Sequence, residues 1–225
     1  MLAEKLVDFE KKKDTRIKLA YLPSVGKVRL RLTIKGENKH ELESVIENAK
    51  QEVINAVSEH IYGFDDDTLE ATIGTLLLDK NMQLGTAESC TGGYLAHIIT
   101  SVSGSSAYFK GSIISYANEI KMELLGVQES TLNEFGAVSE QTVSEMISGA
   151  LQKLNVDVAI AISGVAGPSG GSEEKPVGTV FSGVGTKDRN YIKRLKFTNN
   201  RTRNIELSAT MALVLLRKFL LNQVG

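Results

Sequence analysis

The stretch MQLGTAESCTGGYLAHIITSV, residues 82–102, decides the fold of most of this chain. It begins with a short apolar run that predicts a buried strand over 83–87, and it ends with the apolar spacing of a helix over 91–102. Between them stands AESCTGG (87–93), where serine, cysteine and threonine are followed by two glycines. A strand that runs directly into a helix is the repeating unit of α/β proteins, so the stretch predicts a layered α/β domain.

The same alternation continues from residue 68 to the end of the sequence. The predicted strands are 83–87, 111–116, 156–163, 177–185 and 191–197, and the predicted helices are 68–80, 91–102, 118–125, 139–153 and 202–221. VDVAIAI (156–162) is almost wholly apolar, as a strand covered on both faces should be. We therefore expect a three-layer α/β/α domain with a parallel or mixed sheet over residues 66–225.

The first 65 residues predict a separate, small α+β module. IKLAYLPSVGKVRLRLTIKG (17–36) predicts two strands around a turn, the second with apolar and basic residues in alternation. Asn38–Tyr62 has helical apolar spacing, so the module has a ββα, KH-like pattern. A KH domain clamps nucleic acid with a GXXG loop, which residues 1–65 lack, so we expect a solvated basic face rather than a nucleic-acid site.

An acidic joint, FDDDT (64–68), separates the two parts and places the predicted boundary between 1–65 and 66–225. Its aspartates suit the positive N-terminus of the helix predicted to follow.

The composition argues against nucleic-acid binding, membrane binding and metal binding. The formal net charge of −1 offers no general attraction to nucleic acid or to an anionic membrane. No apolar run approaches the ~18–20 residues that a membrane helix needs. The single cysteine fits a reducing cytosol, and we expect a cytoplasmic protein. The histidines do not cluster, and neither CxxC nor HExxH occurs, so we expect no metal site.

AESCTGG allows three interpretations. It could cradle a phosphate, since a helix N-terminus attracts anions, although it matches neither GxxxxGK[ST] nor GxGxxG, which disfavours a nucleoside triphosphatase. It could hold a nucleophile. It could also be only a tight turn, with Ser89 or Thr91 as the N-cap of the helix.

The nucleophile interpretation needs a base. His97 lies eight residues, or roughly 12 Å of helix, beyond Ser89, which argues against a Ser–His–Asp triad. SYANEIK (115–121) supplies Tyr116 and Lys121, and a desolvated lysine can act as a base. Cys90 is the rival nucleophile, unless it is buried under the turn.

A second loop, ISGVAGPSGGSEEKPVG (162–178), follows the most apolar predicted strand. Ligands of open α/β sheets bind beyond the C-terminal ends of the strands, which is where both this loop and AESCTGG are expected.

Several longer stretches now match a known family. They are AESCTGG, GSSAYFKGSIISYANEIKMELLGV, FGAVSEQTV, ISGVAGPSGGSEEKPVGTV and FTNNR. Together, in this order, they resemble the C-terminal domain of the competence/damage-inducible protein CinA family. That domain also stands alone as nicotinamide mononucleotide (NMN) deamidase. Longer family members carry a KH-like module before it and a molybdopterin-binding-like domain before that, so we expect this sequence to correspond to the later part of such a protein.

The resemblance implies an amidohydrolase that converts NMN to nicotinic acid mononucleotide and ammonia. Ser89 would be the nucleophile, Lys121 the general base, and Tyr116 a proton relay or orienting group beside the lysine. Arg201 would contact the substrate phosphate, and Glu88 would either bind substrate or support the turn. The implied substrate-binding residues are Glu88, Thr91, Gly92, Gly93, Ser163, Gly164, Gly167 and Arg201.

The resemblance implies no cofactor and no metal, and it suggests a homodimer. From the charge and the lack of a long apolar run we expect no membrane partner. The alternative function is a catalytically silent module for assembly or partner binding.

Overall fold

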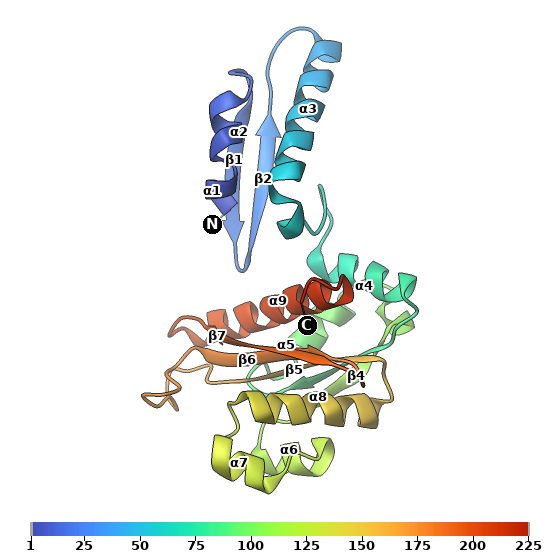
Figure 1. Ribbon diagram of the computed structural model, residues 1–225, viewed down its shortest axis with the longest axis vertical. Helices are drawn as coiled ribbons and strands as arrows, with labels where there is room; N and C mark the ends of the chain where they lie inside the picture. Colours follow the sequence, from blue (N-terminus) through green and yellow to red (C-terminus); the bar gives the residue numbers. More distant parts are fainter. Residues whose placement is uncertain (1, 225) are drawn as a thin grey trace. The chain divides into compact units, whose positions relative to one another are not determined.

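The computed structural model describes residues 2–224, and the chain forms two compact units, Met1–Asp67 and Thr68–Gly225. Figure 1 shows the elements of each unit along the chain.

The small unit contains an antiparallel hairpin, β1 with β2, that packs against helices. Its elements are α1 (Leu2–Lys5), α2 (Val7–Lys12), β1 (Lys18–Ser24), β2 (Lys27–Thr33), α3 (Lys39–Val57) and the 3-10 turn η1 (Ser58–His60). The core of the unit contains Leu6, Phe9 and Ile17 from the N-terminal segment and Ala49, Val53 and Val57 of α3. The predicted strands and long helix are present, and Arg29 and Arg31 lie on the exposed face of β2 as expected.

Two details of this unit differ from the sequence-based expectation. The helices α1 and α2 were not predicted, because Leu6, which lies between them, and Phe9 of α2 stand within a strongly charged stretch. The acidic segment 64–68 also differs from the expectation. Thr68, rather than an aspartate, caps α4 (Leu69–Asp79) by accepting from the Ala71 N–H. Asp67 instead accepts from the backbone N–H of Phe64 and so closes a turn.

The large unit is built on a five-stranded mixed sheet of order β4-β3-β5-β6-β7. Strand β3 pairs in parallel with β4 and β5, whereas β6 is antiparallel to both β5 and β7. The strands are β3 (Leu84–Glu88), β4 (Phe109–Ile114), β5 (Val158–Gly164), β6 (Thr179–Gly185) and β7 (Asn190–Lys196). The helices are α4 (Leu69–Asp79), α5 (Tyr94–Thr100), α6 (Asn118–Leu125), α7 (Glu129–Phe135), α8 (Glu140–Leu154) and α9 (Arg201–Leu220), with the 3-10 turn η2 (Ser105–Ala107).

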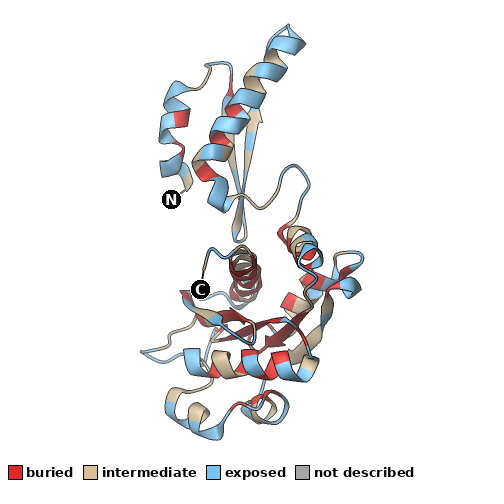
Figure 2. Cartoon of the chain, turned by 45° about the vertical axis from the view of Figure 1, so that its right-hand side comes forward, coloured by how far each residue is buried: buried red, intermediate tan, exposed pale blue. Residues whose placement is uncertain are grey.

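Helices cover both faces of this sheet, which confirms the predicted three-layer α/β/α architecture. Helix α8 packs on one face, and α6 and α7 pack against α8. Helix α9 packs on the other face, where α4 and α5 contact it (Figure 1). The central strand β5 is buried along most of its length, in agreement with its apolar sequence (Figure 2).

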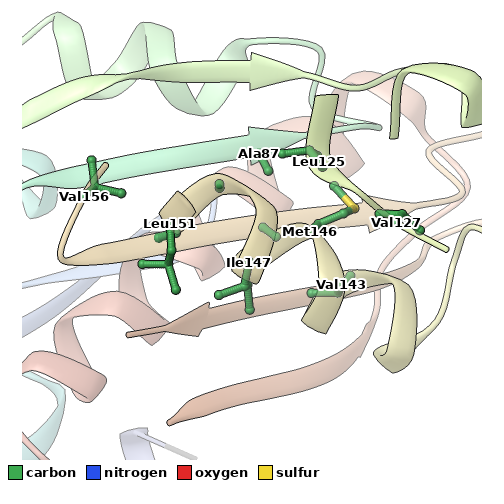
Figure 3. Close-up of a cluster of buried hydrophobic side chains, with 11 residues drawn as sticks. Ala87, Leu125, Val127, Val143, Met146, Ile147, Leu151 and Val156 are labelled. Atoms are coloured by element: carbon green, nitrogen blue, oxygen red, sulfur yellow. The ribbon is translucent and has the colours of Figure 1, made fainter. Parts of the chain in front are cut away.

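The core between α8 and the sheet fixes the helix that carries Lys121. Met146, Ile147 and Leu151 of α8 meet Leu125 at the end of α6 and the strand residue Ala87 (Figure 3). Gly149 of α8 has no room for a side chain, because a Cβ atom there would clash with the backbone carbonyl of Leu125. The close approach of α6 and α8 therefore depends on glycine at this position.

Some element boundaries were predicted wrongly. Strand β4 ends at Ile114 rather than at residue 116, so Ser115 and Tyr116 lie beyond the strand. Helix α5 begins at Tyr94 rather than at residue 91, because the turn continues through Gly93. Helix α7 was not predicted, since its seven residues carry too short an apolar pattern. Within residues 2–224, no helix has the length and apolar character to cross a membrane.

Candidate functional site

Ser89 stands at the C-terminal edge of the sheet, directly after β3. Its backbone N–H donates to the carbonyl of Ile162 on β5 at 3.0 Å. On the other side, the N–H of Ser115 donates to the Glu88 carbonyl at 2.8 Å, which extends the pairing of β3 with the β4 side. Ser89 itself is 8% exposed. The parallel strands thus hold the serine between two neighbouring strand ends, where open α/β sheets place their ligands.

The side chain of Lys121, on α6, contacts the Ser89 hydroxyl. Its Nζ lies 3.1 Å from Ser89 Oγ, and it donates to the carbonyls of Ser115 at 2.7 Å and Tyr116 at 3.3 Å. The side chain is buried, with 1% of the residue exposed, and burial lowers the lysine pKa from its ordinary value. A neutral amine can donate to both carbonyls and still direct its lone pair to the serine hydroxyl. The arrangement therefore suits a lysine that accepts the proton of Ser89.

Cys90 is placed unfavourably for a nucleophile. Its side chain is buried, and burial raises the pKa of the thiol to about 12. A thiol with so high a pKa is almost entirely protonated near neutral pH, and the reactive form is the thiolate. The structure favours packing under the turn as the role of Cys90.

Replacement of Cys90 by alanine is expected to leave kcat/KM for the reaction proposed below within a few-fold of the parent value. The variant loses only a small buried side chain and no hydrogen bond to Ser89 or Lys121. Steady-state kinetics on the purified variant, beside its melting temperature, test this expectation. Loss of activity in a variant that remains folded would identify the thiol as the reacting group.

Glu88 fills the anion cradle at the start of α5. Its carboxylate accepts from the backbone N–H groups of Gly93 at 3.0 Å, Leu95 at 3.1 Å and Ala96 at 2.8 Å, and from the Ser112 hydroxyl at 3.2 Å. A phosphate at this helix end would have to displace a fully buried carboxylate. These contacts argue against the phosphate-cradle interpretation of AESCTGG, and of the two roles considered for Glu88 they favour turn support.

The N-cap interpretation of the turn is also wrong. The N-cap position of α5 is Gly93, and neither Ser89 nor Thr91 caps the helix with its side chain. Gly92 and Gly93 have φ angles of 58° and 97°, a left-handed conformation that favours glycine. The backbone N–H groups of Cys90 and Thr91 donate to no backbone carbonyl within residues 2–224. Both groups follow Ser89 directly in the turn, which makes them the candidate donors for an oxyanion.

The Tyr116 side chain lies differently from the expectation. It is 60% exposed, and its hydroxyl accepts from Arg201 Nη2 at 3.0 Å. Lys121 contacts the backbone carbonyl of Tyr116, not its phenol. Arg201, at the first position of α9, also donates from Nη1 to the Gly167 carbonyl at 2.8 Å. The segments that follow β4 and β5 are therefore tied to the start of α9.

The end of β5 and the glycine-rich loop after it are held by contacts to segments other than the AESCTGG turn. Ser163 donates to the Ala137 carbonyl at 2.6 Å, so its hydroxyl supports the turn between α7 and α8. Gly164 lies against Val180 and the Thr179 carbonyl, where a Cβ atom would meet both closely. Lys175, which the sequence did not single out, donates to the Phe135 carbonyl at 2.5 Å. These contacts hold the end of β5 and the loop after it against neighbouring elements.

Two family models match the chain, one over each unit. The model of the CinA C-terminal domain matches residues 66–220, and that of the damage-inducible protein CinA KH domain matches residues 1–63. A CinA-like protein of Cytophaga hutchinsonii is 44% identical over 217 residues, which are 96% of this chain and 52% of that protein. One from Thermotoga maritima is 42% identical over 193 residues, 86% of this chain and 46% of that protein. The chain spans about half the length of the curated relatives it matches.

The solved structures that resemble this chain cover about two thirds of it. The competence/damage inducible protein CihA from Agrobacterium tumefaciens has a TM-score of 0.64 at 36% identity, covering 68% of this chain and 94% of its own. A CinA superfamily protein from Klebsiella pneumoniae has a TM-score of 0.67 at 33% identity, covering 68% and 96%. With matches to both of its units, this chain belongs to the CinA family, and it joins a CinA KH module to a CinA C-terminal domain.

Proposed function

We propose that the large unit is an amidase that hydrolyses the carboxamide of nicotinamide mononucleotide, giving nicotinic acid mononucleotide and ammonia. The observation that carries the proposal is the 3.1 Å contact between Ser89 Oγ and the buried Nζ of Lys121. Family membership makes an amide of a pyridine nucleotide the substrate class to test first.

The reaction proceeds by acyl transfer. Neutral Lys121 takes the proton of Ser89 as Oγ bonds to the carboxamide carbon, and the N–H groups of Cys90 and Thr91 stabilise the oxyanion. The C–N bond then breaks, and the Lys121 ammonium gives its proton to the departing nitrogen, which leaves as ammonia. Water next attacks the ester carbon, its proton passes to Lys121, and Ser89 regains a proton as the carboxylic acid departs. The products account for one NMN and one water.

Arg201 binds the substrate phosphate in this proposal. It stands in the first turn of the 20-residue helix α9, which holds no acidic residue in that turn, so the helix dipole and the guanidinium attract the same anion. Its two present partners, the Gly167 carbonyl and the Tyr116 hydroxyl, are neutral. A phosphate at Arg201 would therefore gain a charge-assisted contact without breaking an ion pair.

Ammonia and nicotinic acid mononucleotide should be formed from NMN in equal amounts by the purified chain, with EDTA present. The control is the double variant Ser89→Ala, Lys121→Met, prepared in parallel so that a contaminating amidase is detected. If the folded parent releases no ammonia, the proposal fails, and the alternative of a silent assembly or partner-binding module takes its place.

Arg201→Met is expected to raise KM for NMN by about 10- to 100-fold, the usual cost of losing a charge-assisted hydrogen bond. Nicotinamide riboside lacks the phosphate, so the parent should hydrolyse it poorly and the variant no worse than the parent. Initial rates on both substrates measure the effect, with Arg201→Lys as the variant that keeps the charge. Equal losses on NMN and the riboside would instead mean that Arg201 acts through Tyr116 or the loop.

A further inference from the structure

Asn204 is a fully buried polar side chain on α9, three residues after Arg201, and it is 0% exposed. Its Nδ2 donates to the carbonyls of Ala166 and Thr198, both at 2.9 Å. Its Oδ1 accepts from the backbone N–H and from the hydroxyl of Thr198, both at 3.0 Å. Both N–H groups and both acceptor positions of the side-chain amide are therefore in use.

These contacts join two loops at the start of α9. Ala166 lies in the loop that follows β5, and Thr198 lies in the connection from β7 to α9. Among residues 2–224, no backbone N–H donates to the carbonyl of Ala166 or of Thr198. Buried backbone groups need a partner, and here the Asn204 side chain supplies the hydrogen bonds that a neighbouring strand supplies within a sheet.

Arg201 contacts the next residue of the same loop. Its Nη1 donates to the Gly167 carbonyl, which directly follows the Ala166 carbonyl that Asn204 holds. Residues three apart share one face of a helix, so both side chains meet the loop from the same side of α9. The other partner of the guanidinium is the phenol of Tyr116, which is 60% exposed, and exposed side chains change rotamer readily. The contact with the loop is therefore the better fixed of the two.

We infer that Asn204 is a positioning residue for phosphate binding, because it fixes the loop after β5 to the start of α9 and so directs the Arg201 guanidinium. The inference rests on the amidase function proposed above, in which Arg201 binds the substrate phosphate. Arginine binds phosphate through a planar fork whose direction matters, and two of its five N–H groups are used by the loop and the phenol. The remaining N–H groups face an anion correctly only while the loop is held. Ser89 and Lys121 are held by other contacts, so the reacting pair does not depend on Asn204.

Asn204→Ala is expected to raise KM for NMN by about tenfold and to change kcat by less than about threefold. On nicotinamide riboside, which has no phosphate, kcat/KM should stay within about threefold of the parent value. Ser208→Ala is the matched control and should change neither substrate's kinetics. Ser208 is also buried on α9, and its hydroxyl donates only to the backbone carbonyl of Asn204. Rates are measured well below the melting temperature of each variant.

The double variant Arg201→Met, Asn204→Ala separates positioning from a general loss of structure. If Asn204 acts through Arg201, the two effects are not additive, and the double variant has the KM for NMN of Arg201→Met alone. An unchanged KM in Asn204→Ala, additive effects, or an equal loss on the riboside would overturn the inference while the amidase function stands.

A milder variant keeps the test decisive if Asn204→Ala does not fold. Thr198→Val removes the hydroxyl that donates to Asn204 Oδ1, and it should raise KM for NMN by about threefold in the parent but not in Arg201→Met. An unchanged KM in the parent background, or an equal rise in both backgrounds, would overturn the inference.

If the parent hydrolyses no amide, the amidase proposal fails and calorimetry decides the role of Asn204 separately. Nicotinic acid mononucleotide should then bind the parent about tenfold more tightly than it binds Asn204→Ala. Absent or equal binding would overturn the inference.

Discussion

Replacing Ser89 by alanine is expected to lower kcat/KM for NMN by at least about 10⁴-fold, since removal of a catalytic nucleophile usually costs this much or more. The serine hydroxyl is the group to which buried Lys121 is directed, at 3.1 Å, and the neighbouring thiol has a pKa raised to about 12. No other hydroxyl or thiol contacts the lysine Nζ among the described residues. Steady-state ammonia release measures the loss.

The Ser89→Ala variant should remain folded. Its backbone bonds to Ile162 and Gly92 do not involve the side chain, so the turn is expected to keep its shape and the melting temperature to change little. Cys90→Ala serves as the neighbouring control. Activity of Ser89→Ala within tenfold of the parent would show that another group attacks the amide.

Lys121→Met is expected to lower kcat/KM by about 10²- to 10⁴-fold, the range that general acid–base catalysis contributes. Methionine fills a similar buried volume but cannot accept the Ser89 proton. Burial lowers the pKa of Lys121, so the parent's kcat/KM should rise with pH through a value below the ~10.4 of free lysine. We expect kcat/KM to rise rather than fall with pH, because only the deprotonated amine accepts a proton and its fraction increases as the pH rises.

The dependence of kcat/KM on pH shows whether Lys121 acts as a base or only as a structural positive charge. Lys121→Arg keeps a positive charge but does not deprotonate in a protein, so it should be as inactive as Lys121→Met. A flat profile for the parent from about pH 6 to 10, or substantial activity in Lys121→Arg, would rule out the lysine as base.

The fold was predictable because its signals are local. Strand and helix patterns alternate from residue 68, and the apolar VDVAIAI gives the buried central strand β5. The parts that were missed, α1, α2 and α7, have four to seven residues each and depend on packing rather than on their own pattern. Short segments of this kind have little helix stability of their own, so tertiary contacts decide them.

The site was predictable only in part, because its geometry joins residues that are distant in sequence. Residue types and the family resemblance selected Ser89 and Lys121, and the structure brings these two side chains together. Sequence reasoning could not show that Glu88 occupies the cradle of its own turn, since the Glu88 side chain could equally have faced a ligand. It also placed Tyr116 beside Lys121, whereas the phenol pairs with Arg201, 85 positions away.

The most direct test of the account is to trap the acyl-enzyme. The parent chain would be mixed with NMN, quenched in acid within one turnover, digested and examined by mass spectrometry. The account predicts that the peptide containing AESCTGG gains the mass of the nicotinoyl nucleotide, and that fragmentation places it on Ser89. An adduct on Cys90, or ammonia release with no adduct at any quench time, would contradict a mechanism in which Lys121 activates Ser89.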